Sequence, residues 1–221
     1  MTEKTLLYTH PSGGFWTIPG VNYKRRIIGI GTYRLFEQMT PAMNQEQLAE
    51  FYEKEKQKGN PYPTDASLLW TICTSAYTLK NTNPQEAEKL KVFLKNSFRE
   101  YPNTLTRIIY NPSGKDKIVY NYRTSGQYYL DAKVVGPDGG INEIPDKNIL
   151  EKFLGTSNIK QINEVSQWIN NTNMYIWRMN LNPETKDERV ARFNALDGRF
   201  DLVCDRFPPS KFPAFRVLRV D

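Results

Sequence analysis

Residues 189–220 read RVARFNALDGRFDLVCDRFPPSKFPAFRVLRV. Arg189–Ala195 is a strand candidate, and polar and apolar side chains alternate in Arg199–Asp205 with the period of two that is typical of β-strands. Leu196-Asp197-Gly198 separates these segments and contains the Asp-Gly pair that favours a hairpin turn. The sequence therefore predicts a hairpin, then a loop over Arg206–Phe212, then a final strand over Pro213–Val220.

Alternation in the second segment assigns its side chains to two faces of the strand. One face carries Phe200, Leu202 and Cys204, and the other carries Arg199, Asp201, Val203 and Asp205. The apolar face is expected to pack against the rest of the protein. Phe200 is then a core residue, unless a bulge or a curled loop turns its side chain outward.

The composition of the same stretch is unusual. Residues 194–210 contain no Lys, Glu, Gln, Met or Trp. These amino acids are the ones encoded only by codons that end in a purine. A segment whose codons keep a final pyrimidine while their leading bases are randomised would lack all of them. Hairpins are poor in these residues in any case, so the composition is compatible with diversification without requiring it.

The first part of the chain predicts short strands followed by helices. Glycines interrupt apolar pieces at Thr5–His10, Phe15–Ile18 and Arg26–Ile30, which favours strands or tight turns over residues 1–40. Residues 44–99 are expected to be helical, because a capping residue precedes each of three segments with an apolar stripe. The caps are Asn44, Asp65 and Asn83, the last of which is followed by Pro84.

Residues 104–188 predict two hairpins, two short helices and a strand. Leu105–Asn111 with Lys117–Tyr122, and Tyr128–Val135 with Ile141–Ile144, each flank a turn signal. The helices are expected near Lys147–Leu154 and Ile159–Ile169, separated by Gly155. A strand over Met174–Met179 and a polar connector over Asn182–Glu188 then lead to the closing hairpin.

The bulk composition limits the class of protein. A chain of 221 residues with 39% hydrophobic and 24% charged residues suits one domain over residues 1–221 that needs no metal or disulfide to fold. Cys73 and Cys204 are then expected to be small buried hydrophobic residues. No apolar run approaches the ~18 residues of a membrane span, and Met1–Tyr8 lacks a secretory signal. We therefore expect a cytoplasmic or virion-associated protein.

Candidates for catalysis and metal binding are few. The single histidine, His10, precedes Ser12 in a segment that lacks the strand-to-helix turn of a catalytic nucleophile. The chain has no paired Cys or His spacing that would suit zinc. The oxygens of Asn182–Glu188 are expected to form a solvated loop rather than a calcium site. The sequence thus predicts no enzyme, no metal site and no cofactor.

A basic nucleic-acid-binding module is the alternative function. The net charge is +6, and aromatic residues that could stack on bases lie beside a basic one in Tyr120-Asn121-Tyr122-Arg123. The positive charge is scattered, however, and its tightest cluster is Lys24-Arg25-Arg26, which is too short to mark a binding surface. Nucleic acid is therefore the less favoured partner.

Three pieces of the chain resemble the C-terminus of a known family. They are Arg189-Val190-Ala191-Arg192-Phe193, Leu202-Val203-Cys204 and Pro213-Ala214-Phe215-Arg216-Val217-Leu218-Arg219-Val220. Together they resemble the variable proteins of diversity-generating retroelements, especially the archaeal and archaeal-virus members. The same ending resembles the closing strands of C-type lectin folds of the formylglycine-generating-enzyme-like subgroup. Chain length and the order of helices and strands support the resemblance outside this region.

The resemblance implies an α+β, C-type-lectin-like fold and a protein that binds a macromolecular ligand, such as a protein or a cell-surface component. In that family a retroelement mutates adenines in a C-terminal cassette, so that exposed side chains change while the fold is retained. The variable region would be about residues 190–217. Its ligand-binding side chains would be Asn194, Leu196, Asp197, Gly198, Phe200, Asp201, Val203, Asp205, Arg206 and Phe207, with Arg199 and Phe212 as further candidates.

The scaffold implied by the resemblance consists of Phe193, Leu202, Cys204 and the run Pro213–Val217. The family pattern requires an exposed Phe200, whereas the alternation described above places Phe200 in the core. The chain also lacks the Glu-Pro-Asn and Trp-Asn-Asp patterns of calcium-dependent sugar-binding lectins and the paired cysteines of formylglycine-generating enzymes. Neither a calcium-dependent sugar site nor that oxidase activity is therefore expected, while an oligomer is compatible with the sequence.

Overall fold

Two β-sheets and five α-helices make up the part of the chain that the computed structural model describes, which is residues 14–23, 29–144 and 147–221. The fold mixes helices with antiparallel and parallel strand pairs, in agreement with the predicted α+β class. The strand expected over Thr5–His10, the lone histidine and the cluster Lys24-Arg25-Arg26 lie outside the described residues.

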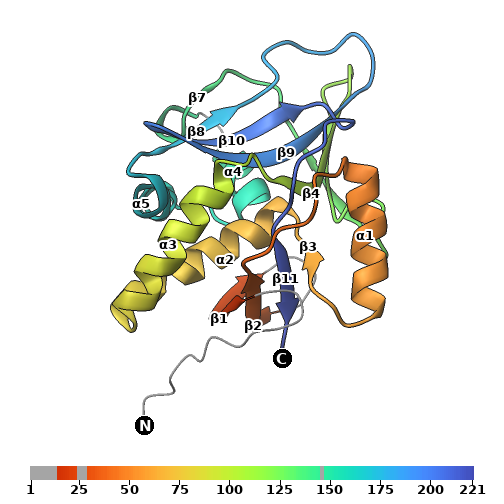
Figure 1. The fold of residues 1–221 in the computed structure, drawn as a ribbon. Helices are drawn as coiled ribbons and strands as arrows, with labels where there is room; N and C mark the ends of the chain where they lie inside the picture. Colours follow the sequence, from red (N-terminus) through yellow and green to blue (C-terminus); the bar gives the residue numbers. More distant parts are fainter. Residues whose placement is uncertain (1–13, 24–28, 145–146) are drawn as a thin grey trace.

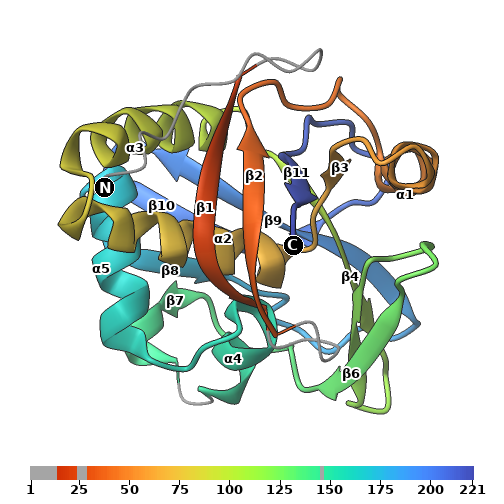
Figure 2. The same cartoon turned by 90° about the horizontal axis from the view of Figure 1, so that it is seen from below.

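The smaller sheet brings together segments from the two ends of the chain (Figure 2). Its strands, in spatial order, are β1 (Phe15–Tyr23), β2 (Gly29–Phe36), β11 (Arg216–Arg219) and β3 (Tyr62–Pro63). Antiparallel pairing of β11 with β2 places Val217 opposite Leu35, and both side chains are fully buried. The last strand therefore packs into the same core as the first strands of the described chain.

The larger sheet contains the closing hairpin. Its strands, in spatial order, are β6 (Tyr128–Ala132), β5 (Asp116–Tyr120), β4 (Asn103–Tyr110), β9 (Asp187–Leu196), β10 (Arg199–Arg206), β8 (Met174–Trp177) and β7 (Gly139–Gly140). The hairpin β9–β10 occupies the middle of this sheet, because β9 also pairs with β4 and β10 also pairs with β8. The β10–β8 pair is parallel. Support from both sides gives the hairpin the stability that an isolated hairpin lacks.

The hairpin predicted over Tyr128–Ile144 is wrong. Strand β6 pairs with β5 at one edge of the larger sheet, whereas β7 pairs with β8 at the other edge. The segment between them is held by side chains: Asp116 accepts a hydrogen bond from the Val134 amide (2.8 Å), and Arg178 donates to the carbonyls of Val134 (2.7 Å) and Val135 (2.9 Å). These long-range bonds replace a strand pair, and no local turn signal could reveal them.

The predicted caps start the long helices. Asn44 accepts a hydrogen bond from the Gln47 amide, while the Gln47 side chain accepts from the Asn44 amide, and this pair forms a capping box. The Asp65 and Asn83 side chains cap the next two helices by accepting a hydrogen bond from the amide three residues further on, and Gly155 ends the fourth with a φ of 72°. The α-helices are α1 (Gln45–Gln57), α2 (Ala66–Thr78), α3 (Pro84–Phe98), α4 (Asn148–Leu154) and α5 (Ile159–Asn170).

The main core lies between the larger sheet and the helices α2, α3, α4 and α5, which cover one of its faces (Figure 1). Aromatic rings fill this layer. Phe98 of α3 makes an edge contact with Phe200 (5.2 Å between ring centroids), and Trp70 of α2 stacks on Phe193 (5.8 Å). Cys73 and Cys204 are buried, as predicted, and both are free thiols. The helix-facing side of the hairpin is thus part of the core.

Candidate ligand-binding face

The strands β9, β10 and β8 have a second face that points away from the helices (Figure 1). We call it the outer face. It is identified by alternation, because Phe200 and Leu202 point toward the helices and are fully buried, so their neighbours along β10 point the other way. The side chains on the outer face are Tyr175, Trp177, Arg192, Asn194, Arg199, Asp201, Val203 and Asp205.

The register arranges these side chains in two rows. One row runs from Tyr175 through Asp201 to Asn194, and the next runs from Trp177 through Val203 to Arg192. Neighbouring side chains on one face of a sheet interact directly. Each row thus combines an aromatic residue of β8 with a polar residue of β9.

Asp201 is covered by other side chains of the outer face. The Arg199 Nε donates a hydrogen bond to Asp201 Oδ2 (3.0 Å) and lies 2.9 Å from Oδ1, and the same guanidinium group lies 5.0 Å from the centre of the Trp177 ring. The arginine therefore extends along the sheet and leaves Asp201 only 1% exposed. Burial raises the pKa of Asp201, and the charge of Arg199 opposes this shift.

Arginines and aromatic rings also pair at the other end of the outer face, next to the loop 207–215. The guanidinium of Arg192 lies over Phe212 (4.7 Å) and Tyr101 (5.3 Å), and that of Arg206 lies over Phe212 (4.7 Å). Arg189 lies over Phe207 (4.2 Å). Stacking of this kind holds a planar guanidinium by its face and leaves its edge N–H groups free to donate.

Several buried polar atoms in this region lack a hydrogen-bond partner. They are Nε and Nη1 of Arg192, Nε of Arg206, Oδ1 of Asn194 and Oδ1 of Asn103. The Arg192 residue is 8% exposed, and burial, together with the nearby charge of Arg206, lowers its pKa to about 10. Arg192 is therefore still a cation at neutral pH. Unpartnered polar atoms of this kind are uncommon in protein interiors and mark a region that a ligand could complete.

The residues predicted for ligand binding fall into three environments. Asp197, Gly198, Asp205 and Phe207 are exposed, and Leu196 and Arg206 are partly buried. Asp201 and Val203 lie on the outer face, as alternation predicts, and Asn194 lies there too. Other side chains cover all three, so the expectation that they are exposed is wrong. Phe200 is fully buried, and the strand bulge lies between Val203 and Arg206, where it does not affect Phe200.

Gly198 differs from the other candidates because its backbone restricts substitution. It has a φ of +74°, whereas Asp197 does not have a positive φ. We expect Gly198→Val to lower the free energy of unfolding by about 1–2 kcal/mol, because side chains with a Cβ disfavour the left-handed region. Gly198→Asn should cost clearly less, since asparagine tolerates that region. Urea unfolding of both variants measures the difference, and equal losses would contradict this explanation.

Aromatic and basic residues outside the predicted set complete the outer face. Tyr175, Trp177, Tyr101, Arg189 and Arg192 were not among the predicted ligand-binding residues, while Arg199 and Phe212 were further candidates. The alternation in β8 places Tyr175 and Trp177 on one face and could have suggested an exposed aromatic pair. Their position beside β10 depends on a parallel strand pair, which local patterns do not encode.

Comparison of the chain with protein-family models, with curated proteins and with solved structures gives no match. Within the described ranges, no group of three or more His, Cys, Asp or Glu side chains is placed to hold a metal ion. None of the helices in the described part of the chain combines the length and apolar character needed to cross a membrane. The outer face is therefore interpreted from its own geometry.

Proposed function

We propose that this chain is a ligand-binding protein of the C-type-lectin-like class. The proposal is supported by one small sheet in which the last strand, β11, pairs with β2 from the start of the described chain, and by a second sheet in which no helix of the described chain covers the outer face of the C-terminal hairpin (Figure 1). Within this class we assign it to the variable proteins of diversity-generating retroelements, on the resemblance of residues 189–220. We expect it to be no enzyme, and to bind a protein or a cell-surface component.

The main support for the proposal is that helices pack against one face of the hairpin, whereas no helix of the described chain covers its outer face (Figure 1). The Asn170 side chain donates to the carbonyls of Leu196 (2.7 Å) and Arg199 (2.8 Å), on either side of the turn. Substitution of outer-face side chains would leave this support in place.

The side chains on the outer face suit recognition of a macromolecule. Arginine, tyrosine and tryptophan dominate the binding energy of protein interfaces, and they gather here around β10. Phe207, directly after β10, is 60% exposed, and Leu181, in the connector between β8 and β9, is 81% exposed. Exposed apolar side chains beside such anchors are typical of an interaction surface.

A randomised library tests the proposal directly. We expect proteins with random residues at Leu196, Asp197, Asp205, Arg206 and Phe207 to remain folded, because exposed or partly exposed substitutions change stability by only about 0.5 kcal/mol each. The melting temperature of sampled members should stay within a few degrees of the wild type. Selection on immobilised streptavidin and serum albumin should yield different binders from the same library. If most members are unfolded, the proposal fails.

The assignment to retroelement proteins has a genetic consequence. The genome that encodes this chain should carry, beside a reverse-transcriptase gene, a second copy of the coding sequence for about residues 190–217. The two copies should differ at positions where the second copy has adenines. Sequencing the surroundings of the gene decides this point, independently of whether the outer face binds a ligand.

A further inference from the structure

Arg192 of the outer face and the neighbouring Arg206 differ from the other arginines around them in forming no ion pair with a described residue. Arg199 forms an ion pair with Asp201, and Arg189 contacts Asp187. Among the described residues no ion pair is formed by Arg192 or Arg206, although the charges of Asp205 and Asp201 lie near Arg192 and partly offset the lowering of its pKa by burial and by Arg206. A positive charge thus gathers at one end of the face, where both guanidinium groups lie 4.7 Å from the centre of the Phe212 ring.

The free-energy cost of leaving Arg192 and Arg206 without an ion pair indicates that a negatively charged ligand group would stabilise them. A buried charge without an ion pair is unfavourable, because the protein replaces water that would otherwise solvate it. Stacking on Phe212 and Tyr101 recovers part of that free energy, but it leaves Nε and Nη1 of Arg192 and Nε of Arg206 without acceptors. Aromatic stacking also fixes the guanidinium planes before a ligand arrives, which lowers the entropy lost on binding.

The loop that carries Phe212 is itself held in place. The Phe212 backbone exchanges two hydrogen bonds with Met43 (3.0 and 3.1 Å), and the Asn103 side chain donates to the carbonyls of Met43 and Ser210 (both 3.2 Å). The two arginines are therefore arranged around a fixed aromatic ring. A preorganised pair of guanidinium groups is suited to a planar acceptor with two oxygens.

We propose that Arg192 and Arg206 bind a carboxylate group of a protein ligand, from an aspartate, a glutamate or a C-terminus. This inference rests on the proposed function of the outer face and specifies the chemistry of its partner. A carboxylate accepts two parallel hydrogen bonds from a guanidinium group and supplies the missing negative charge. The remaining aromatic side chains of the face would contact the apolar part of the same ligand segment.

The acidic residues of the outer face favour a protein over a nucleic acid as the source of the negative charge. Asp201 and the exposed Asp205 lie on the same strand as Arg206. A phosphate backbone repeats its charge along its length and would meet these carboxylates as well as the arginines. The carboxylates of a protein segment lie on separate flexible side chains, so one of them can reach the arginine pair while the others turn away from Asp201 and Asp205.

Short peptides provide the test. The probes are a hexa-aspartate peptide with blocked ends, the matching hexa-asparagine peptide and a 12-nucleotide oligothymidylate. Binding is followed at low salt by calorimetry and by the Nε–Hε NMR signals of the arginines. We expect the hexa-aspartate to bind and to shift the signals of Arg192 and Arg206 but not that of Arg107, which already has its acceptors. The hexa-asparagine should not bind.

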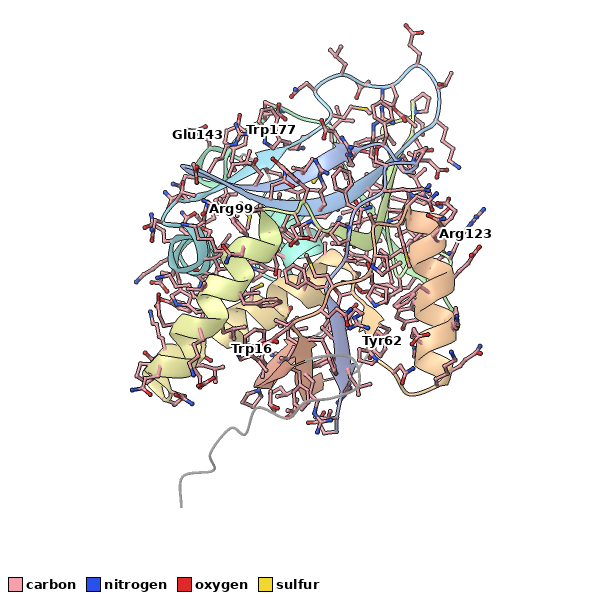
Figure 3. The ribbon with its side chains drawn as sticks, in the orientation of Figure 1. Trp16, Tyr62, Arg99, Arg123, Glu143 and Trp177 are labelled. Carbon is pink, nitrogen blue, oxygen red and sulfur yellow. The ribbon has the colours of Figure 1, made fainter. Side chains whose placement is uncertain are left out.

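Two double variants that remove equal positive charge distinguish binding at Arg192 and Arg206 from a general attraction between the acidic peptide and the basic protein. Arg192→Gln/Arg206→Gln should weaken hexa-aspartate binding at least tenfold. Lys115→Gln/Arg123→Gln removes the same charge elsewhere and should change it less than twofold; Figure 3 shows Arg123 beside α1, far from Trp177 on the outer face. If the first double variant does not fold, Arg206→Gln alone, at a partly exposed position, is compared with Arg123→Gln.

Three results would overturn this inference. Equal losses in the two double variants would mean that net charge alone attracts the peptide. Tighter binding of the oligothymidylate, with shifts of the same arginine signals, would assign the face to nucleic acid. If hexa-aspartate does not bind, the proposed carboxylate site is wrong. Binders selected from the library above would still support the proposed function in that case, so the two proposals can fail separately.

Discussion

Replacing Phe200 with alanine is expected to lower the free energy of unfolding by about 3–5 kcal/mol, which is the usual effect of removing a buried aromatic ring. The Phe200 ring is fully buried and lies within 5.2 Å of Phe98 and 6.1 Å of Trp70, measured between ring centroids. The alanine variant leaves a cavity between the hairpin and two helices. Urea unfolding followed by circular dichroism measures the loss.

Phe207 provides the matched control for this prediction. It is also a phenylalanine of the closing stretch, but it is 60% exposed and contacts Arg189. Phe207→Ala should therefore change the free energy of unfolding by no more than about 0.5 kcal/mol. Similar losses in the two variants would mean that the faces of β10 have been assigned wrongly. A large loss for Phe200 alone would show that this position cannot vary freely in a ligand-binding surface.

Replacing Arg107 with leucine is expected to cost about 2–3 kcal/mol, because it breaks a nearly buried ion-pair network. The Arg107 side chain is 3% exposed and binds Glu188 (2.6 Å) and Glu46 (3.0 Å), and its Nε donates to the buried Gln45 side chain. These contacts fasten α1 to strands β4 and β9, next to the hairpin. The loss lies below that of a fully buried pair because both carboxylates keep some contact with water.

Arg123 is a close control for Arg107, since both lie near Glu46 and over Tyr122. The Arg123 guanidinium is 3.8 Å from the Glu46 carboxylate and 5.6 Å from the Tyr122 ring centre, but its side chain is 63% exposed. Arg123→Leu should change the free energy of unfolding by less than about 0.5 kcal/mol. If it costs as much as Arg107→Leu, the network does not depend on burial.

The effect of Arg107→Leu should also depend on pH. Partial burial raises the pKa of Glu188, but hydrogen bonds from Lys186 and Arg107 outweigh it and lower the pKa overall. A lowered carboxylate pKa contributes stability above the ordinary glutamate value of about 4.3, and that contribution is lost as the pH falls through the folded-state value. The gap between wild type and Arg107→Leu should therefore narrow below about pH 4. A constant gap would exclude Glu188 as a partner.

The local elements of the fold could be predicted from the sequence because their signals are local. Asn44, Asp65 and Asn83 cap helices where they were expected to, and Gly155 ends one. These residues act through hydrogen bonds to amides three positions away, or through their own backbone conformation. The hairpin of residues 187–206 was predictable for the same reason, since its turn and its alternation lie within one short segment.

The composition of the candidate site was harder to predict, because burial on the outer face comes from neighbours that are distant in the chain. Asp201 was expected to be exposed, and it does point away from the core, but Arg199 and the residues of β8 cover it. Trp177 reaches the face through a parallel strand pair, and Tyr101 through the end of α3. Neither neighbour can be inferred from the spacing of residues in β10.

The sequence by itself determined where the helices α1, α2 and α3 begin and which side of β10 is apolar. It left open whether Phe200 belongs to that side, because the family resemblance required an exposed Phe200. Only the tertiary structure decided that β6 and β7 lie at opposite edges of one sheet, and that Arg192 and Arg206 meet over Phe212 without forming an ion pair with a described residue. The physical reason is the separation along the chain over which each kind of interaction acts. Caps, turns and alternation act over a few residues, whereas strand order and the pairing of charges depend on contacts between residues far apart in the chain.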